Sequence, residues 1–446
     1  MEKFCAALRL IRNSTDIGAV LARGSANFAV IQVLGAALAY LLQVLLARWM
    51  GADEFGLYIY AFSWVAFLSL PAQLGFNTAL LRLVAQYNVT GDYSRLKGLL
   101  QRSNQLTVLS SFIVAGVGIG VVLLLRDSLT VGLLPVIIVA FGLIPILVPA
   151  QLSQATLRAL RYVKEAYLPE YVMQPLIVIF IAFLVQIASG SVNALAAMNI
   201  KLLAVGLSLI FRWFWLWKLF LHNLRQYKPV IETRFWLSVS IPLVLFSASN
   251  LILNQTDILM IGSLINPAES GIYAVAVKTA NLTAFALAAV NAIAAPMIAS
   301  LYQERRTQDL QNMVKMATIW IFWISLPICL ILIIGGHLFL RLFGEEFIAA
   351  RLSLAILAIG QLFNAMCGSV GNLMIMTGYQ NESAKVIAYA AIFNVVLNGS
   401  LIPLFGIYGA AISTAASTIL WNIWLMILVY KRLGIKSSII MFMLPG

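Results

Sequence analysis

Apolar runs of roughly 20 residues recur along the whole chain, with short polar segments between them. A helix of about 20 apolar residues spans the hydrocarbon core of a bilayer, so each run predicts one transmembrane helix. The predicted spans are 25–49, 57–80, 105–125, 130–153, 169–188, 192–217, 236–262, 271–298, 315–340, 352–376, 383–404 and 407–430. The pattern therefore predicts an all-α membrane protein with about twelve transmembrane helices.

Composition supports a lipid environment. Of 446 residues, 62% are hydrophobic and only 10% are charged, whereas a soluble domain carries about 25% charged residues. So few charges cannot cover the surface of a soluble protein of this length, but lipid tolerates such a surface.

Lysine and arginine are concentrated in alternate segments between the spans. Four of the 29 would lie on the outer side if the N-terminus is cytoplasmic, three fall within helices, and the remaining 22 would be cytoplasmic. Cytoplasmic loops carry an excess of these residues, so both termini are predicted to be cytoplasmic. The net charge of +13 is then explained by these loops, and nucleic acid is not an expected partner.

An internal repeat divides the chain. Three pairs of similar segments occur at offsets of 215, 216 and 217 residues: Glu54–Tyr58 with Glu269–Tyr273, Val192–Ala196 with Tyr408–Ile412, and Arg161–Glu165 with Gly378–Glu382. Two six-helix halves with the same orientation would be related by an axis along the membrane normal.

The repeat and the charges predict five parts. They are a cytoplasmic amphipathic segment (1–24), an N-terminal six-helix lobe (25–217), a cytoplasmic linker (218–235), a C-terminal six-helix lobe (236–430) and a short basic cytoplasmic tail (431–446). Residues 1–24 are no secretory signal, because arginines interrupt their apolar residues.

Cations at bilayer depth cost at least about 2.5–3.5 kcal/mol each and usually face a partner or a water-filled cavity. Lys201 and Lys278 lie well inside predicted spans, and both are candidates to line a cavity. Arg212 could do the same or extend to the lipid headgroups. Arg48 ends the first span and could anchor that end or guard a cavity mouth.

Asp257 is the one carboxylate well inside a predicted span, and it lies in a polar patch. It could pair with Lys278 or bind a cation, since carboxylate and amide oxygens suit hard cations. Asn394, Asn398 and Thr414 are the further candidate ligands; interhelical hydrogen bonding is the alternative role. For Glu170, at the start of the fifth span, we expect a helix-capping role.

Motifs of enzymes are absent from the sequence. It contains no phosphate-binding P-loop, no H-E-x-x-H and no pair of carboxylates on a large loop. Its three cysteines and two histidines have no metal-ligand spacing. The longest predicted loop, 81–104, is too short to form a catalytic domain. The sequence therefore predicts neither an enzyme nor a protein with a bound cofactor.

Three stretches resemble the polysaccharide transporter family of the multidrug/oligosaccharidyl-lipid/polysaccharide (MOP) exporter superfamily. They are Leu46–Tyr58, Asn254–Gly262, and Asn394–Asn398 followed by Ile402–Ala411. The resemblance runs from about residue 25 to residue 430 and implies two six-helix bundles around a central cavity. It also implies alternating access, driven in some relatives by Na⁺ or H⁺.

The same resemblance implies a substrate and a location. The substrate would be an undecaprenyl-diphosphate-linked oligosaccharide, such as an O-antigen, capsule or exopolysaccharide repeat unit. The protein would be a flippase in the cytoplasmic (inner) membrane, with membrane lipids and polysaccharide assembly proteins as partners. Lys278, Lys201, Arg48 and Arg212 would then offer positive charge to the diphosphate.

Two other functions remain open at this point. A cation-coupled antiporter for drugs or small solutes could use the same fold, but three intramembrane cations to one acid favour an anionic substrate. A membrane-embedded glycan polymerase or ligase would be expected to have a substantial outer loop, and the predicted outer loops are short.

Overall fold

A computed structural model describes residues 17–222 and 224–443, and every regular element within these ranges is a helix. Eleven of the helices are long and apolar enough to span a membrane. One of the eleven, Ile31–Ala72, covers most of both the first and the second predicted span. The predicted all-α membrane architecture of about twelve spans is therefore confirmed.

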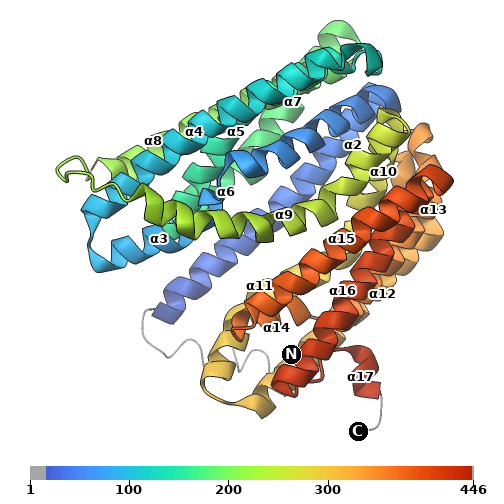
Figure 1. Cartoon of the computed structure of the whole chain (residues 1–446). Helices are drawn as coiled ribbons and strands as arrows, with labels where there is room; N and C mark the ends of the chain where they lie inside the picture. Colours follow the sequence, from blue (N-terminus) through green and yellow to red (C-terminus); the bar gives the residue numbers. More distant parts are fainter. Residues whose placement is uncertain (1–16, 223, 444–446) are drawn as a thin grey trace.

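The first two passes form one long element, α2 (Ile17–Ala72). A straight helix of its 56 residues would be about 84 Å long, more than twice the hydrocarbon core. Gly51 interrupts it with φ 73° and ψ 174°, which is not a helical conformation. The chain turns back there, and Figure 1 shows the two arms of α2 meeting at one end of the molecule. We call this end the Gly51 end.

Each lobe follows the same order of helices. The N-terminal lobe continues with α3 (Phe76–Thr90), α4 (Tyr93–Leu124), η1 (Arg126–Ser128), α5 (Leu133–Ala159), α6 (Val163–Leu168), η2 (Pro169–Met173), α7 (Gln174–Ser189), α8 (Ala194–Leu216) and η3 (Trp217–Leu221). The C-terminal lobe contains α10 (Pro267–Ala280), η4 (Asn281–Ala284), α11 (Phe285–Gln303), α12 (Thr307–Arg341), η5 (Glu345–Ala350), α13 (Arg351–Cys367), α14 (Val370–Met376), α15 (Gln380–Phe405), α16 (Ile407–Leu433) and α17 (Ile439–Met443). Figure 1 shows the two lobes diverging from the Gly51 end.

The backbone repeats with the sequence. Gly190 and Gly406 end α7 and α15 with positive φ at an offset of 216 residues. Arg161 and Gly378 adopt positive φ at an offset of 217, where the sequence repeat places them. The same turns therefore close the same helices in both lobes.

Several predicted spans are broken or extended. The second span (57–80) ends at Ala72, and α3 begins after a turn in which Leu74 has positive φ. The eighth span is divided by η4, and the tenth by Gly368. The predicted loop 81–104 is wrong, because α3 and α4 fill it except for Gly91 and Asp92. Polar residues end an apolar run in the sequence, but they need not end a helix outside the bilayer.

The terminal segments lie partly within the described ranges. Residues 1–16 of the predicted amphipathic segment lie outside them, and residues 17–24 form the start of α2. Residues 444–446 of the tail also lie outside. Between the lobes, the backbone N–H of Val230 donates to the carbonyl of Ser94 at 3.1 Å, which fixes part of the predicted linker to the N-terminal lobe.

One helix belongs to both lobes. α9 (Thr233–Leu264) follows the linker, and its first turn buries Trp236 in the core of the N-terminal lobe. The Trp236 indole N–H donates to the Tyr87 hydroxyl at 3.2 Å. Further along, α9 packs against α15 and α16 of the C-terminal lobe. The two lobes are therefore joined by α9 as well as by the contacts of α2.

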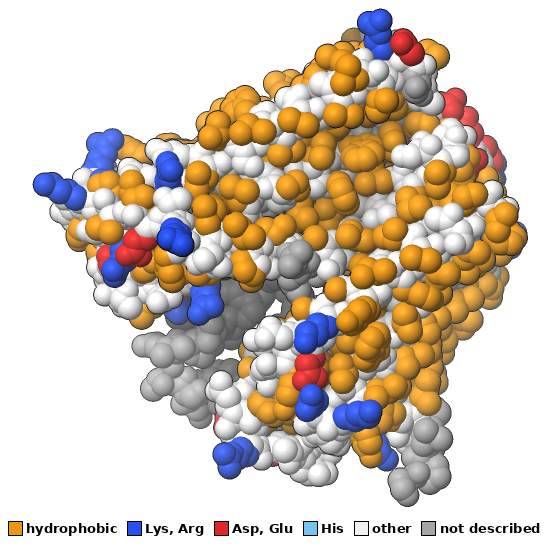
Figure 2. Space-filling view, in the orientation of Figure 1, with side chains coloured by type: hydrophobic (Ala, Val, Ile, Leu, Met, Phe, Trp, Pro, Cys, Tyr) orange, Lys and Arg blue, Asp and Glu red, His pale blue; other side chains and the backbone are white. Residues whose placement is uncertain are grey.

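The surface matches a membrane protein. Large apolar side chains are exposed on the flanks, for example Phe180, Trp323 and Ile334. Figure 2 shows hydrophobic side chains across the middle of this face and most Lys and Arg side chains near its ends. Such a distribution suits a molecule whose middle is surrounded by hydrocarbon.

Candidate functional site

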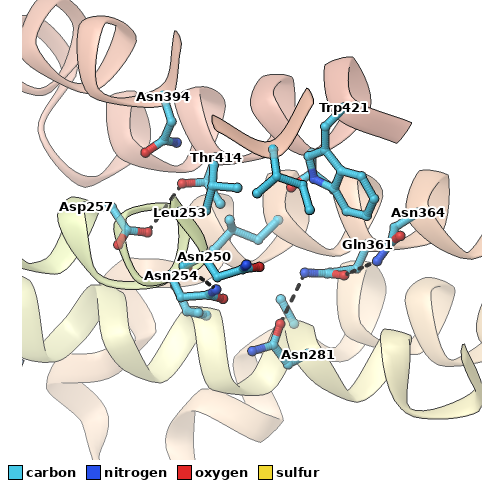
Figure 3. Close-up of a pocket in the computed structure, with 15 residues that line it drawn as sticks. Asn250, Leu253, Asn254, Asp257, Asn281, Gln361, Asn364, Asn394, Thr414 and Trp421 are labelled. Carbon is cyan, nitrogen blue, oxygen red and sulfur yellow. Dashed lines mark hydrogen bonds between the residues drawn. The ribbon is translucent and has the colours of Figure 1, made fainter. Parts of the chain in front are cut away.

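A polar cavity of about 240 Å³ lies inside the C-terminal lobe. Figure 3 shows side chains from several helices pointing into it. Its polar lining consists of amides, two threonines and one carboxylate: Asn250, Asn254, Asp257, Asn281, Gln361, Asn364, Asn394, Thr414 and Thr418. Trp421 and a few apolar residues complete the wall. The cavity is therefore rich in hydrogen-bonding groups and has a single acidic residue.

Asp257 is 3% exposed and is held by three hydrogen bonds. Its Oδ1 accepts from the backbone N–H of Ile258 at 2.9 Å. Its Oδ2 accepts from the Tyr273 hydroxyl at 2.8 Å and from Thr414 Oγ1 at 3.3 Å. No ion pair joins Asp257 to Lys278 within the described part of the chain. Of the two partners that the sequence left open, the lysine is therefore not in contact, and hydrogen bonds satisfy the carboxylate.

Asn394 and Asn398 share one face of α15. Asn398 Nδ2 donates to Asn394 Oδ1 at 2.9 Å, and both residues are buried. Asn394 also lines the cavity, and its buried Nδ2 has no hydrogen-bond partner among the described residues. Asp257 and Thr414 offer a carboxylate and a hydroxyl oxygen to the cavity, and the Asn394 amide oxygen, which accepts from Asn398, keeps a second lone pair. Oxygen ligands of these kinds suit a hard cation.

In the N-terminal lobe, Lys201 belongs to a polar cluster. Its Nζ donates to Gln174 Oε1 at 3.0 Å and lies 5.5 Å from the centre of the Phe62 ring. Gln174 Nε2 in turn donates to Ser208 Oγ at 2.9 Å. Amide dipole and aromatic face both stabilise the ammonium group, and no carboxylate touches it among the described residues.

Arg212 is buried, with its side chain 1% exposed, so it does not extend to the headgroups. Its Nη1 donates to the Ala150 carbonyl at 2.9 Å, and its Nη2 lies 3.2 Å from Glu170 Oε2. Gln154 donates to the same carboxylate oxygen at 2.8 Å. Glu170 lies in the π-helical turn η2, so this acid serves as the partner of a buried arginine. Sequence reasoning missed the pair, because 42 residues separate its members.

Lys278 and Arg48 are both exposed, and neither forms an ion pair with another residue of the described ranges. Neither belongs to the cavity lining or to the Lys201 cluster. Lys278 follows Gly271 by seven residues on α10, so the two lie on the same face of the helix. The structure therefore brings the candidate residues together in two groups, one per lobe, and leaves these two cations outside both.

The lobes touch at the Gly51 end through equivalent glycines of the sequence repeat. A Cβ atom on Gly271 would lie 2.7 Å from the Cα of Gly56, and one on Gly56 would overlap the carbonyl of Pro267. Glu346 of η5 accepts a hydrogen bond from the backbone N–H of Ala52 at 2.7 Å. We call these residues the outer contact, because the charge distribution predicts that the Gly51 end faces outward.

Sequence reasoning did not identify Tyr273, nor Gln174 and several residues of the cavity lining: Asn281, Gln361, Asn364, Thr418 and Trp421. Tyr273 lies in the second copy of the repeat, is fully buried, and contacts both Asp257 and Thr414. The sequence repeat pairs Tyr273 with Tyr58 and could have drawn attention to it, but it does not show toward which neighbouring helix the Tyr273 hydroxyl points.

Solved structures with the same architecture are transporters. An inward-facing multidrug resistance MATE family transporter of the MOP superfamily matches with a TM-score of 0.71 and 16% identity, over 91% of this chain and 98% of that one. An outward-facing structure of a multidrug resistance MATE family transporter matches with a TM-score of 0.61 and 16% identity, over 92% of this chain and 95% of that one. A MOP superfamily transporter from Pyrococcus furiosus, described as having a binding pocket of reverse polarity that suggests a different function, scores 0.63 with 15% identity and covers 92% and 95% of the two chains. These likenesses establish the fold.

Two curated relatives are archaeal. The chain is 28% identical over 177 residues to an uncharacterized membrane protein of Methanocaldococcus jannaschii, covering 39% of this chain and 35% of the relative. It is 24% identical over 162 residues to the probable low-salt glycan biosynthesis flippase Agl15 of Haloferax volcanii, covering 36% and 34%. The matches thus span about a third of each relative.

Two family profiles match the chain. The MatE profile matches residues 242–404. The profile described as polysaccharide biosynthesis protein matches residues 21–302, which is more than half of the chain. This multi-pass membrane protein therefore belongs to the polysaccharide biosynthesis protein family, and its fold is that of the solved MATE family transporters.

Proposed function

We propose that the protein is a flippase that moves an undecaprenyl-diphosphate-linked oligosaccharide across the cytoplasmic membrane by alternating access. The observation that carries this proposal is the sign of the charges at bilayer depth. Neither Lys201 nor Lys278 forms an ion pair with an acid among the described residues, whereas Arg212 is paired with Glu170, the same carboxylate that acts on Lys201 from a greater distance. Unpaired cations attract a diphosphate and disfavour cationic drugs.

Lys278 is the best placed of these cations. It shares a face of α10 with Gly271, which contacts the N-terminal lobe at the outer contact. Two helical turns further from the Gly51 end, where the lobes diverge, the same face carries the exposed Lys278 side chain. A diphosphate that reaches the closed end of the space between the lobes would meet this ammonium group.

The cavity of the C-terminal lobe supports the oligosaccharide part of the proposal. Amide and hydroxyl side chains dominate its polar lining, and Trp421 supplies an aromatic wall. Uncharged sugars need hydrogen-bond donors and acceptors rather than charges. Asp257 is the exception, and we propose that with Asn394, Asn398 and Thr414 it binds the coupling cation, Na⁺ or H⁺. A cation that binds one conformation more tightly shifts the protein toward that conformation.

The alternative is a cation-coupled antiporter for drugs or small solutes. The MATE-like fold and the single buried carboxylate in the cavity favour this second candidate. Deleting the gene and measuring lipid-linked glycan separates the two. A flippase predicts accumulation of lipid-linked glycan on the cytoplasmic face with loss of surface polymer, whereas heightened drug sensitivity with unchanged polymer would identify the antiporter.

A point substitution tests the role of the cation. Lys278→Ala should lower glycan export at least tenfold, because a hydrogen bond to a charged group contributes about 1.5–3 kcal/mol. Lys278→Arg should restore most of the export, and Lys385→Ala, at the end of the eleventh span that is predicted to face the cytoplasm, serves as the control. Normal export by Lys278→Ala at equal membrane abundance would remove this residue from the substrate site.

A further inference from the structure

One segment of α10 connects the outer contact to the candidate cation site. Residues 270–276 are all buried, and α10 packs against α2 of the N-terminal lobe as well as against α9 and α13. Gly271 meets Gly56 of the N-terminal lobe, and Tyr273, two residues later, reaches Asp257 of α9. Residues two apart point to different sides of a helix. The segment therefore contacts the opposite lobe on one side and the carboxylate on the other.

The Tyr273 hydroxyl is part of a closed triad. It donates to Asp257 Oδ2 at 2.8 Å and lies 3.3 Å from Thr414 Oγ1, which lies 3.3 Å from the same carboxylate oxygen. A hydroxyl has a single proton, so its strong bond goes to the nearest acceptor, the carboxylate. A cation at Asp257 would compete for the lone pairs that this hydroxyl now uses.

The first copy of the repeat has a tyrosine at the equivalent position but no acid. Tyr58 lies 215 residues before Tyr273 and is also buried. Its ring stacks on Phe62, and its hydroxyl forms no hydrogen bond with another residue of the described ranges. The two tyrosines thus share a place in the fold, and the contact with the carboxylate distinguishes Tyr273.

We propose that Tyr273 is a positioning residue that transmits cation occupancy of Asp257 to the outer contact. The proposal rests on the cation-coupled function proposed above. When a cation takes Oδ2, the tyrosine loses or reorients its hydrogen bond, and the segment that carries Gly271 shifts against Gly56. Closely packed interfaces of this kind switch between discrete arrangements instead of deforming gradually. By linkage, the factor by which a bound cation changes the equilibrium between the open and closed outer contact is also the factor by which opening changes the cation affinity.

The test separates binding from response. The full chain, with Cys5, Cys329 and Cys367 replaced by alanine, carries spin labels at Val131→Cys and Leu404→Cys, which are 99% and 73% exposed near the Gly51 end. Label distances and binding of radioactive ²²Na⁺ are measured in lipid nanodiscs across an NaCl titration, with KCl at constant ionic strength. In the otherwise unchanged chain, both signals should change over the same Na⁺ range.

Tyr273→Phe should retain Na⁺ binding within about threefold but reduce the Na⁺-dependent distance change at least fivefold, within the usual range of coupling between sites. Tyr58→Phe, the matched control, should leave both signals unchanged, and Asp257→Asn should remove both. A full distance response in Tyr273→Phe, an equal loss in Tyr58→Phe, or loss of Na⁺ binding in Tyr273→Phe would overturn the proposal. Absence of any Na⁺ response in the unsubstituted chain would also overturn it, while the glycan-export assay would still decide the flippase function independently.

Discussion

The two lobes share a backbone but differ in polarity at equivalent positions. The C-terminal residues Asp257, Asn394, Asn398 and Thr414 correspond, at offsets of 215 and 216, to Leu42, Val178, Ala182 and Met198. In the opposite direction, Lys201 and Arg212 correspond to Ser417 and Leu428. Asp257, Asn394 and Asn398 thus have apolar counterparts in the N-terminal lobe. Lys201 and Arg212 of α8 have uncharged counterparts in the C-terminal lobe.

The repeat therefore preserves the turns and the contacts between the lobes, and it does not preserve the polar side chains. The features that both lobes keep are the turns at Gly190 and Gly406 and the glycines Gly56 and Gly271 of the outer contact. These positions determine how the lobes pack and turn. The polar groups diverged, so Asp257 and its neighbouring amides occur in one lobe and the buried cations of α8 in the other.

The close packing of the lobes at the outer contact can be tested at Gly56. Gly56→Leu places a side chain against the Pro267 carbonyl and should separate the lobes at the Gly51 end. A penalty of about 3 kcal/mol, typical of overpacking, would change the ratio of the two conformations roughly 100-fold. Glycan export should be lost, and the distance between labels at Val131 and Leu404 should increase. Gly120→Leu, where a Cβ has open space, is the control; an unchanged distance in Gly56→Leu would contradict the role of the contact.

The N-terminal lobe's own polarity can be broken at Arg212. Arg212→Met removes the hydrogen bonds to Ala150 and Glu170 and should destabilise the purified protein by about 2 kcal/mol. Because Glu170 is 44% exposed, we attribute most of this loss to the hydrogen bonds and not to the charge. Thermal unfolding in detergent measures the effect. Adding Glu170→Gln to Arg212→Met should recover part of the lost stability. Leu428→Met, at the equivalent position of the C-terminal lobe, should change stability little. Equal losses of stability in Arg212→Met and Leu428→Met would contradict a special role for the buried arginine.

Two glutamates cap helix starts at the Gly51 end, one across the lobes and one within a lobe, and their substitution should have a smaller effect. Glu346 accepts from Ala52 across the lobes, whereas Glu54 accepts from Ala194 at 2.6 Å within one lobe. Each carboxylate lies near the start of a helix, where negative charge contributes about 0.3–1 kcal/mol. Glu346→Gln should shift the Na⁺ concentration at the midpoint of the label-distance change by up to fivefold. Glu54→Gln should lower thermal stability and leave that midpoint unchanged. A midpoint shift of equal size in Glu54→Gln would show that the cap across the lobes is not specific to the outer contact.

Sequence reasoning predicted the helices well and their breaks poorly. Runs such as 192–217 and 407–430 are almost entirely apolar, so hydropathy locates them to within a few residues of α8 and α16. The turn at 73–75 and the short helix η4 lie inside apolar runs, where composition does not register a change of direction. The helical segment over 81–104 was missed for the opposite reason, because its polar residues resemble a loop.

The candidate site was predicted by residue type and not by contact. Charge at bilayer depth identified Asp257, Lys201 and Arg212 without showing their partners. Tyr273 and Gln174 are commonplace residues in apolar helices, and only the packing of each helix against its neighbour gives them a role. Periodicity cannot reveal this, since a helix apolar on all faces does not indicate which side meets its neighbour.

The division of α9 between the lobes has a consequence for biosynthesis. The ribosome delivers the first six passes before α9, so a nearly complete half is already in the membrane when Trp236 emerges. Docking of that indole beside Tyr87 gives the incoming helix a fixed starting place and direction. The later passes are then assembled on a template provided by the earlier ones, and the order of translation becomes part of how the mature protein acquires its shape.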